Sequence, residues 1–310
     1  MKIPFNNILY RVLISDDVDP SGIKILPVEK FKVIYKPGIS DQDIFKNYSD
    51  FDVLVIRSIR KIDRKFLEKV SFKLIATCSK GTDHIDLKYA ASKKIKIINA
   101  EEGNTVSAAE HTLALILNIY KGILRSDKLV REGRFRETGF RRNELMGKTI
   151  GIIGFGKVGS RVGKFCRAFG MNVIANDTDE KIIAKNKGFK FDTLNSVLKS
   201  SDIVSIHIPL NKRNANFFSE NKLKNLKKDS VLINTSRGGI MDEKYLLKML
   251  KSGKIRYAGL DVFRNEPHIN KGFAELENVL LTNHTAGKTV ESRERISGFI
   301  FKKINSLFQK

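Results

Sequence analysis

Short apolar runs alternate with amphipathic segments along the first hundred residues of the chain. The runs have the length of buried strands, and the segments between them repeat apolar residues at helical spacing. Strands are expected at Tyr10–Ser15, Lys32–Tyr35, Asp52–Arg57, Leu74–Thr77 and Ile95–Ile98, with helices around Ile44–Tyr48, Ile62–Val70 and Leu87–Lys93. This alternation predicts an α/β fold in which helices cover a parallel sheet.

The same alternation returns after residue 148 and predicts a second, doubly wound parallel sheet between about residues 104 and 285. Its expected strands are Thr149–Ile153, Val173–Ala175, Ile203–Ile208, Ser230–Ile233, Ala258–Val262 and Val279–Leu281, with helices at Lys181–Lys185, Leu194–Lys199, Glu220–Asn225 and Glu243–Lys251. The last amphipathic segment, Val290–Phe308, is a helix that can pack back on the first domain. The predicted domains are therefore 1–103 completed by 286–310, and 104–285.

Residues 104–122 form the most apolar helix of the chain, which Asn104 or Thr105 can cap and Gly122 can end. Its broad apolar surface indicates burial between domains or between subunits. We interpret His111, which lies on this helix, as a packed histidine rather than a ligand. The arginine-rich segment Arg131–Arg142 that follows is either a solvated connector or the rim of an anion-binding cleft.

A glycine-rich turn, Gly154-x-Gly156-x-x-Gly159, joins the first strand of the second domain to a helix. The first glycine permits the tight turn, the second lets the backbone approach a pyrophosphate, and the third allows close helix–strand packing. The N-terminus of the helix offers N–H groups to phosphates. Asp177 ends the next strand, where a carboxylate can bind the ribose hydroxyls of NAD and would repel a 2′-phosphate. The pattern predicts an NAD site; the alternative is a glycine-rich turn without a ligand.

Composition narrows the class of protein. A chain of 310 residues is long enough for two ordinary domains. Its only cysteines, Cys78 and Cys166, form no C-x-x-C pair, so neither a disulfide framework nor a metal site is expected, and a reducing, cytoplasmic setting is the simplest interpretation. No signal peptide and no apolar run of membrane-spanning length is visible, so no membrane partner is expected.

The formal net charge is +23, from 57 lysines and arginines against 34 acidic residues. A charge of this size can indicate nucleic-acid binding. The lysines, however, are spread over almost every predicted helix rather than gathered in one stripe. We therefore interpret the charge as a compositional bias and expect no nucleic-acid partner, although the same field would favour an anionic cofactor and an anionic substrate.

Three polar side chains follow strands of the second domain and suit oxidoreductase chemistry. Arg237 could clamp a carboxylate through two donors. His284 could exchange a proton at neutral pH, and a carboxylate such as Glu266 would fix its tautomer and favour its protonated form. Each residue also has a plain structural alternative, as a turn arginine, a solvated turn carboxylate or an ordinary histidine. His207, at another strand end, is interpreted as lining of the cofactor cleft.

The chain resembles the D-isomer-specific 2-hydroxyacid dehydrogenases over nearly its whole length. The stretches that carry the resemblance are KTIGIIGFGKVG, IHIPL, VLINTSRGGIMDE, SGKIRYAGLDVFRNEP and NHTAG, with GTDHID and NTVSAAEHTLAL upstream. The resemblance implies two Rossmann-like domains, of which the substrate domain is formed by both chain ends. It implies Arg237 as the cation that orients the substrate, His284 as the acid/base and Glu266 as its partner.

The resemblance also implies contacts to ligands and to a second copy. The implied cofactor-binding residues are Gly154, Gly156, Lys157, Val158, Gly159, Asp177, His207, Pro209, Thr235 and Asp261, and the implied substrate-binding residues are Arg57, Ser58, Lys80, Gly81, Arg237 and His284. Family members usually dimerise through the nucleotide domain, so a homodimer is expected. The chain departs from the family at Asn283, where proline usually precedes the histidine, and a less rigid loop could change the rate.

The sequence leaves the substrate open. Arg57-Ser58 and GTDHID look most like the 3-phosphoglycerate dehydrogenase branch, and Arg57, Arg60 and Lys80 are candidate cations for a phosphate, or else simple surface charge. Hydroxypyruvate and glyoxylate reductases are close competitors. A different class also stays open, because some family members act as NAD-binding corepressors, although the presence of Arg237, Glu266 and His284 argues against a role in binding alone.

Overall fold

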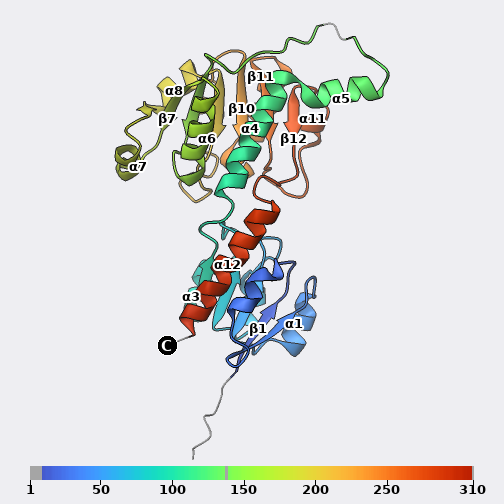
Figure 1. The fold of residues 1–310 in the computed structure, drawn as a ribbon, viewed down its shortest axis with the longest axis vertical. Helices are drawn as coiled ribbons and strands as arrows, with labels where there is room; N and C mark the ends of the chain where they lie inside the picture. Colours follow the sequence, from blue (N-terminus) through green and yellow to red (C-terminus); the bar gives the residue numbers. More distant parts are fainter. Residues whose placement is uncertain (1–8, 137–138, 309–310) are drawn as a thin grey trace, which may run out of the picture. The chain divides into compact units, whose positions relative to one another are not determined.

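The computed structural model describes residues 9–136 and 139–308, and these fall into two compact units. Unit 1 contains the described residues up to Asn104 and those from Lys288 onward, so it is built from both ends of the chain. Unit 2 is the continuous stretch Thr105–Gly287. The boundaries expected from the sequence lie within two residues of these. Each unit is α/β, as Figure 1 shows, which confirms the predicted fold class.

The sheet of unit 1 has five strands in the order β2-β1-β3-β4-β5, and every neighbouring pair is parallel. This is one of the two common orders of doubly wound sheets. The central strands are buried along their whole length, which explains their continuous apolar sequences. The strands are β1 (Tyr10–Ile14), β2 (Phe31–Tyr35), β3 (Val53–Ile56), β4 (Leu74–Thr77) and β5 (Lys96–Asn99).

Helices cover both faces of this sheet. One face packs against α1 (Asp41–Asn47), α2 (Arg64–Glu68) and α3 (Leu87–Ser92). The other packs against the 3-10 helix η1 (Pro20–Ile25) and α12 (Val290–Leu307), the long red helix of Figure 1. The Ser297 hydroxyl donates to the Asp19 carbonyl at 2.6 Å and accepts from the Gly22 N–H at 3.2 Å. A Cβ on Gly22 would lie 2.5 Å from that hydroxyl oxygen, so only glycine permits this approach.

The sheet of unit 2 has seven parallel strands in the order β12-β11-β10-β9-β6-β7-β8. The order reverses between β6 and β9, the arrangement of a Rossmann fold. The strands are β6 (Thr149–Ile153), β7 (Asn172–Asn176), β8 (Lys190–Phe191), β9 (Ile203–Ile206), β10 (Ser230–Asn234), β11 (Ile255–Leu260) and β12 (Val279–Leu281).

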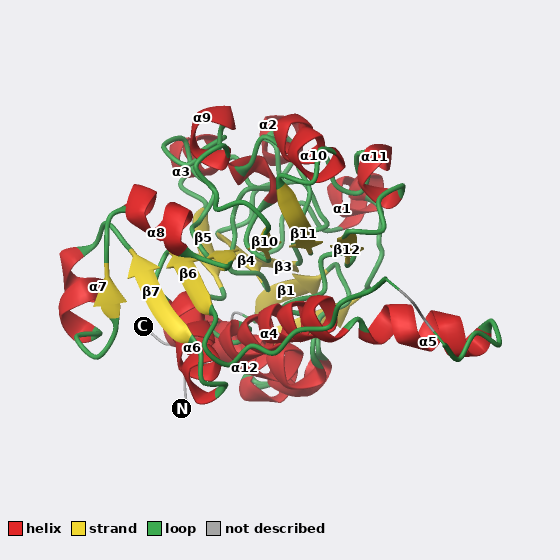
Figure 2. Ribbon diagram, turned by 90° about the horizontal axis from the view of Figure 1, so that it is seen from above, coloured by secondary structure: helices red, strands yellow, loops and turns green. Residues whose placement is uncertain are grey.

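Two apolar clusters fill the two faces of this sheet. On one face α4 (Thr105–Lys121) and α6 (Lys157–Ala168) pack side by side. On the other lie α8 (Leu194–Ser200), α9 (Glu220–Leu223), α10 (Glu243–Lys251) and α11 (Lys271–Ala274), as Figure 2 shows. The short helix α7 (Glu180–Lys185) follows β7, and the 3-10 helix η2 (Gly238–Ile240) follows β10. No helix among the described residues is long and apolar enough to cross a membrane.

The structure corrects several details of the predicted elements. A second helix, α5 (Ile123–Arg131), begins directly after Gly122, which ends α4 in the left-handed conformation at φ 62°. It was not predicted, because the segment was interpreted as part of a basic connector; only Leu129 of the helix is buried. Figures 1 and 2 show α5 projecting from the body of unit 2. The strand at Ala258–Val262 actually starts at Ile255 and ends at Leu260. The short elements η1, β8 and α11 were also not predicted.

Candidate active site

The carboxyl ends of the strands of unit 2 carry most of the predicted site residues. The strands are parallel, so the loops after β6, β7, β9, β10, β11 and β12 leave the same edge of the sheet. In open α/β sheets this edge, at the point where the strand order reverses, is where ligands bind. The residues of these loops therefore lie along one edge of the sheet and form one constellation.

The glycine-rich turn has the geometry that the sequence predicts. Gly154 has φ 87°, and a Cβ there would lie 2.8 Å from the His207 carbonyl oxygen, so glycine is needed for both reasons. A Cβ on Gly159 would lie 2.1 Å from the Gly154 carbonyl oxygen, which shows how closely α6 packs on the turn. At Gly156, in contrast, no heavy atom of the described residues beyond Gly156 and its two chain neighbours would lie within 4 Å of a Cβ. Space above Gly156 is thus open to a ligand.

Asp177 holds the glycine-rich turn from the end of β7. Its Oδ2 accepts a 2.6 Å hydrogen bond from the Phe155 N–H, and its Oδ1 accepts one of 2.9 Å from the Asp179 N–H. Phe155 is buried and packs edge-on against Phe189. The N-cap residue of α6 is Gly156, which makes no side-chain cap hydrogen bond, and the N-terminus of a helix carries a positive partial charge. A carboxylate beside a helix N-terminus suits the ribose and the pyrophosphate of NAD.

The loop after β9 lies against the glycine-rich turn, as the close approach of the His207 carbonyl to Gly154 shows. The His207 Nε2 is 2.8 Å from the Ser205 hydroxyl, which holds the ring. Pro209 is exposed, and its carbonyl accepts from Asn214 at 3.0 Å. Thr235, after β10, is hydrogen-bonded to Thr112 of α4 at 2.9 Å. The predicted cofactor residues His207, Pro209 and Thr235 thus all belong to loops at the same sheet edge.

Arg237 lies three residues after the end of β10 and is half-buried. Its guanidinium Nη1 donates to the Ser236 carbonyl at 2.8 Å, and its own carbonyl accepts from the Asn234 side chain at 3.1 Å. A Cβ on the next residue, Gly238, would lie 1.9 Å from the backbone carbon of Phe263. This glycine therefore lets the Arg237 turn come into contact with the loop that carries Glu266.

Glu266 and His284 form a direct pair. His284 Nδ1 lies 2.6 Å from Glu266 Oε2, and Glu266 Oε1 accepts from the Phe263 N–H at 2.9 Å. Both side chains remain accessible, at 34% for Glu266 and 41% for His284. Since Nδ1 is engaged with the carboxylate, Nε2 is the ring nitrogen left for proton exchange with a ligand.

The pKa of Glu266 lies below its usual value. Burial by itself would raise this pKa. The hydrogen bonds from His284 and Phe263 and the positive charges of His284 and Arg237 together outweigh burial. Glu266 is therefore ionised at neutral pH, which is the form that accepts the hydrogen bond from His284.

Asp261 has a different environment from the one expected of a cofactor ligand. It is fully buried, and its oxygens accept hydrogen bonds from Thr282 Oγ1 at 2.6 Å, from the Thr285 N–H at 2.8 Å and from the Ala286 N–H at 3.0 Å. These donors flank His284 in the sequence. The structure thus shows Asp261 as an anchor of the His284 loop, while its contact with a cofactor stays a prediction.

Sequence reasoning missed two residues that support the Glu266 loop. The Glu243 carboxylate accepts from the Arg264 N–H at 2.6 Å, and the Arg264 guanidinium donates to the Met241 carbonyl at 2.9 Å. Burial, the largest cause, and the negative charge of Glu266 raise the pKa of Glu243, against the effect of Arg264. Neither residue has a signal in the sequence beyond its place beside the motifs, because the contacts join segments 21–23 residues apart.

The predicted substrate residues of unit 1 lie in the loops after β3 and β4. The Arg57 guanidinium donates to the Asp17 carbonyl at 3.3 Å, and Ser58 lies next to it. Arg60 is bound to its own unit: it pairs with the buried Asp16 at 2.9 Å and with Asp41, and it donates to the carbonyls of Ser15 and Ile39. Most of its donors are therefore engaged, which argues against Arg60 as a phosphate ligand.

The Lys80–Gly81 loop after β4 is held by a short chain of hydrogen bonds. The Ser79 hydroxyl donates to the Gly81 carbonyl at 2.8 Å and lies 2.8 Å from the buried Thr77 hydroxyl, which in turn is 3.1 Å from His84 Nε2. Asn99 donates to the Lys80 carbonyl at 2.7 Å. Polar side chains of GTDHID and its neighbours therefore set the loop conformation. This role was not predicted from the sequence.

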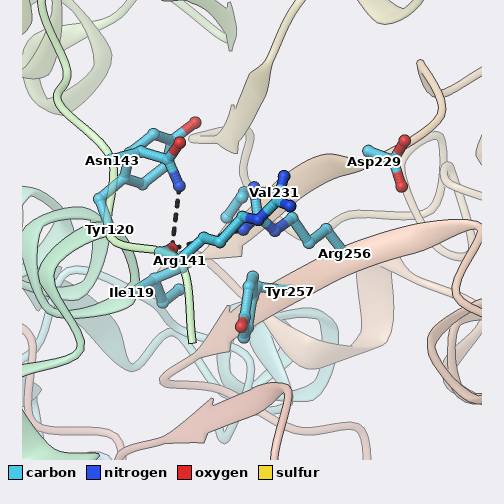
Figure 3. A pocket seen from close by; sticks show the side chains of 8 residues that line it. All are labelled: Ile119, Tyr120, Arg141, Asn143, Asp229, Val231, Arg256 and Tyr257. Atoms are coloured by element: carbon cyan, nitrogen blue, oxygen red, sulfur yellow. Dashed lines mark hydrogen bonds between the residues drawn. The ribbon is translucent and has the colours of Figure 1, made fainter. Parts of the chain in front are cut away.

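A small cavity at the opposite edge of the unit 2 sheet is not part of this constellation. It is lined by Tyr120 of α4, by Arg141, and by Arg256 and Tyr257 at the start of β11, as Figure 3 shows. Its volume of about 20 Å³ has room for roughly one water molecule. Among the described residues, no group of three or more His, Cys, Asp or Glu side chains could hold a metal ion.

Comparison with known proteins identifies the family. Residues 113–286 match the family model of the D-isomer specific 2-hydroxyacid dehydrogenase, NAD binding domain. The chain therefore belongs to the D-isomer specific 2-hydroxyacid dehydrogenases. Unit 2 corresponds to the NAD-binding domain of this family, and the prediction of NAD as the cofactor is confirmed.

Relatives with different names cover almost the whole chain. A D-3-phosphoglycerate dehydrogenase of Methanocaldococcus jannaschii is 33% identical over 97% of the chain, but the chain spans only 58% of that protein. A hydroxypyruvate reductase of Thermotoga maritima is 32% identical over 95% of the chain and 97% of the relative. A solved D-lactate dehydrogenase of Aquifex aeolicus, complexed with NAD and lactic acid, matches with a TM-score of 0.80 and 30% identity, covering 96% of this chain and 95% of that one. All are oxidoreductases, so this class is confirmed for the family.

Proposed function

We propose that this chain transfers a hydride between NAD(H) and a D-2-hydroxyacid or its 2-ketoacid. The observation that carries the proposal is the 2.6 Å contact between His284 Nδ1 and Glu266 Oε2, with the charge of Arg237 acting on the same carboxylate. An acid/base pair beside a cation is what reduction of a ketoacid requires. These groups share one sheet edge with the glycine-rich turn and Asp177.

The residues present fit NAD. Bound NAD supplies or takes up the hydride. Open space beside Gly156, the N-terminus of α6 and the Asp177 carboxylate together suit a pyrophosphate and a ribose. We assign the cofactor contacts to Gly154, Gly156, Lys157, Val158, Gly159, Asp177, His207, Pro209, Thr235 and Asp261.

His284 is the proposed acid/base. In ketoacid reduction it must be protonated, because it donates from Nε2 to the developing alkoxide; in hydroxyacid oxidation it must be neutral, because it accepts that proton. The Glu266 carboxylate holds Nδ1 and so fixes both the ring orientation and the tautomer. Arg237 supplies a planar two-donor cation for the substrate carboxylate. We propose that Arg57, Ser58, Lys80 and Gly81 of unit 1 also bind the substrate.

For the substrate we propose 3-phosphoglycerate, the substrate that the sequence of the loops favours. Relatives of that name support it. Hydroxypyruvate is the second candidate, and a specific observation favours it: Arg60 is engaged by Asp16 and Asp41, so one of the expected phosphate cations is occupied. A phosphate-bearing substrate would then depend on Lys80 and on Arg57, which itself pairs with Asp17 at 3.6 Å.

A panel of 2-ketoacids tests the function and separates the candidates. NADH oxidation is followed with 3-phosphohydroxypyruvate, hydroxypyruvate, glyoxylate and pyruvate, for the parent and for Lys80→Ala. If 3-phosphoglycerate is the substrate, the phosphorylated ketoacid has the highest kcat/KM, and Lys80→Ala lowers only that value. No turnover with any ketoacid, together with intact NADH binding, would favour a corepressor-like role instead.

Glu266→Gln tests the acid/base pair. The amide keeps the shape but removes the negative charge that His284 Nδ1 contacts at 2.6 Å. kcat should therefore fall in both directions, while the KM for NADH stays near that of the parent. His284→Ala should lower kcat in both directions by about 10²–10⁴-fold. A Glu266→Gln variant with the kcat of the parent in both directions would show that the pairing is wrong.

We also propose that the chain forms a homodimer through α5 and Phe135. Ile123, Leu124 and Val130 of α5 expose more than half of their surface, and Phe135, four residues after the end of this helix, exposes 90%. Figure 1 shows α5 projecting from unit 2. Exposed apolar side chains gathered in this way indicate an interface. Phe135→Glu with Leu124→Glu should reduce the mass in light scattering to that of one chain, whereas Lys128→Glu on the same helix should not.

A further inference from the structure

The Asp261 carboxylate holds the chain on both sides of His284. Its Oδ1 accepts from Thr282, two residues before the histidine, and from the Thr285 N–H, one residue after it. Its Oδ2 accepts from the Ala286 N–H at 3.0 Å. His284 itself has φ 55°, in the left-handed region that a residue with a side chain adopts only when its surroundings require it. The buried Asp261 carboxylate holds the backbone of His284 in this conformation through these hydrogen bonds.

His111 extends this arrangement from α4. Its Nε2 lies 3.0 Å from Thr282 Oγ1 and 3.5 Å from Asp261 Oδ1. The Thr282 hydroxyl has one proton and donates it to Asp261 over 2.6 Å, so it must accept from His111. The hydrogen bonds therefore run in one direction, from His111 Nε2–H through Thr282 to the Asp261 carboxylate. His111 and Thr282 are 171 residues apart in the sequence, so this contact is a feature of the fold.

We propose that His111, Thr282 and Asp261 are positioning residues that fix the orientation of His284. The inference rests on the proposed role of His284 as acid/base. The carboxylate fixes the backbone of the histidine, and His111 fixes the hydroxyl that makes the shortest of these hydrogen bonds. Glu266 then holds the ring from the other side. A reacting group displaced by about 1 Å loses about 10²-fold in rate, so support of this kind acts on kcat rather than on binding.

Thr282→Val and Thr282→Ser form the matched pair that tests the inference. Valine keeps the shape but has no hydroxyl, whereas serine keeps the hydroxyl. We expect Thr282→Val to lower kcat by about 10–100-fold with unchanged KM for NADH, and Thr282→Ser to stay within a few-fold of the parent. His111→Leu and His111→Gln form a second pair, because glutamine retains a donor. These decide the question if Thr282→Val does not fold.

Thr285→Val is the control within the same loop. Its hydroxyl is 3.5 Å from Asp261, and its backbone N–H makes the shorter bond, which valine keeps. It should therefore turn over like the parent. An equal loss in Thr282→Val and Thr282→Ser, or in Thr282→Val and Thr285→Val, would overturn the inference, because the hydroxyl of Thr282 would not be the cause.

His284→Ala separates this inference from the proposed function. If His284→Ala turns over like the parent, the proposed acid/base role is wrong and the positioning role falls with it. If His284→Ala is inactive and binds NADH while Thr282→Val and His111→Leu turn over like the parent, the proposed function stands and the positioning role is overturned.

Discussion

At the scale of single residues, the charge on Glu266 couples the stability of the site to pH. Its pKa is lower in the folded protein than in a free glutamate, because His284, Phe263 and Arg237 together outweigh burial. A carboxyl group of this kind stabilises the folded state fully above its unfolded pKa, about 4.3, and loses that contribution as the pH falls through the folded value. The pair with His284 should therefore be strongest from mildly acidic to neutral pH.

We expect the difference in melting temperature between the parent and Glu266→Gln to be constant from about pH 6 down to pH 5 and to shrink below pH 4.3. Differential scanning calorimetry across this range checks the sign. Glu275→Gln serves as the control, because Glu275 is exposed and its charge is not expected to contribute to the stability of the fold. A difference that grows as the pH falls would contradict the ionised state of Glu266.

Arg237→Lys keeps the charge but loses the planar pair of donors. The substrate carboxylate and carbonyl should no longer be held together, and we expect kcat/KM to fall by about 10²-fold or more. Steady-state kinetics with the best ketoacid of the panel measure this, and NADH affinity checks that the cofactor site is intact. Unchanged activity would remove Arg237 from the site.

At the scale of elements, two glycines of the glycine-rich turn have different roles: one allows α6 to pack closely, and the other leaves space for a ligand. Gly159 has no room for a side chain because a Cβ there would lie 2.1 Å from the Gly154 carbonyl oxygen, whereas Gly156 has open space. Gly159→Ala must therefore push α6 away from the turn, and it should lower the melting temperature. Gly156→Ala should leave the melting temperature near that of the parent yet weaken NADH binding, because its methyl group occupies the space meant for the pyrophosphate.

Calorimetry and a fluorescence titration with NADH check the two variants together. Gly253→Ala, at a left-handed glycine in open space far from the turn in the sequence, shows the cost of backbone strain alone. Parent-like NADH binding by Gly156→Ala would mean that the cofactor does not approach the backbone there.

The sequence predicted those elements that depend only on residues close together in the chain. Strand lengths, the glycine spacing and the place of Asp177 follow from residues that are neighbours in the chain. The roles of Arg237, Glu266 and His284 came from the resemblance, and their contact became visible only in the structure. Arg60 was a candidate phosphate ligand because the sequence does not reveal its partner Asp16, which is 44 residues away. Asp261 and Thr282 show the same limit: a buried hydrogen-bond network joins distant segments and leaves no periodic pattern.

At the scale of the whole molecule, the last helix belongs to the unit that the first residues begin. Phe301 of α12 is fully buried in the apolar cluster of unit 1, together with Val12 and Val55. Phe301→Ala should cost about 3–5 kcal/mol of the stability of unit 1. Hydrogen exchange should become faster in β1 and β3, whereas β6 and β10 of unit 2 should be protected as in the parent.

Lys302→Ala, on the exposed side of the same helix, is the control and should leave hydrogen exchange unchanged. Faster exchange in both units of Phe301→Ala would show that they unfold as one cooperative body.

The split origin of unit 1 has a consequence for synthesis on the ribosome. Its strands β1–β5 leave the exit tunnel first, but α12 follows only after the 183 residues of Thr105–Gly287 have been made. At about 5–20 residues per second this delay is roughly 10–40 s, during which one face of the first sheet lacks its covering helix. The nascent chain would expose Val12, Val55 and Ile98 in that interval. A chaperone that binds apolar segments should therefore associate with stalled chains that end near residue 287 and dissociate once α12 has left the tunnel.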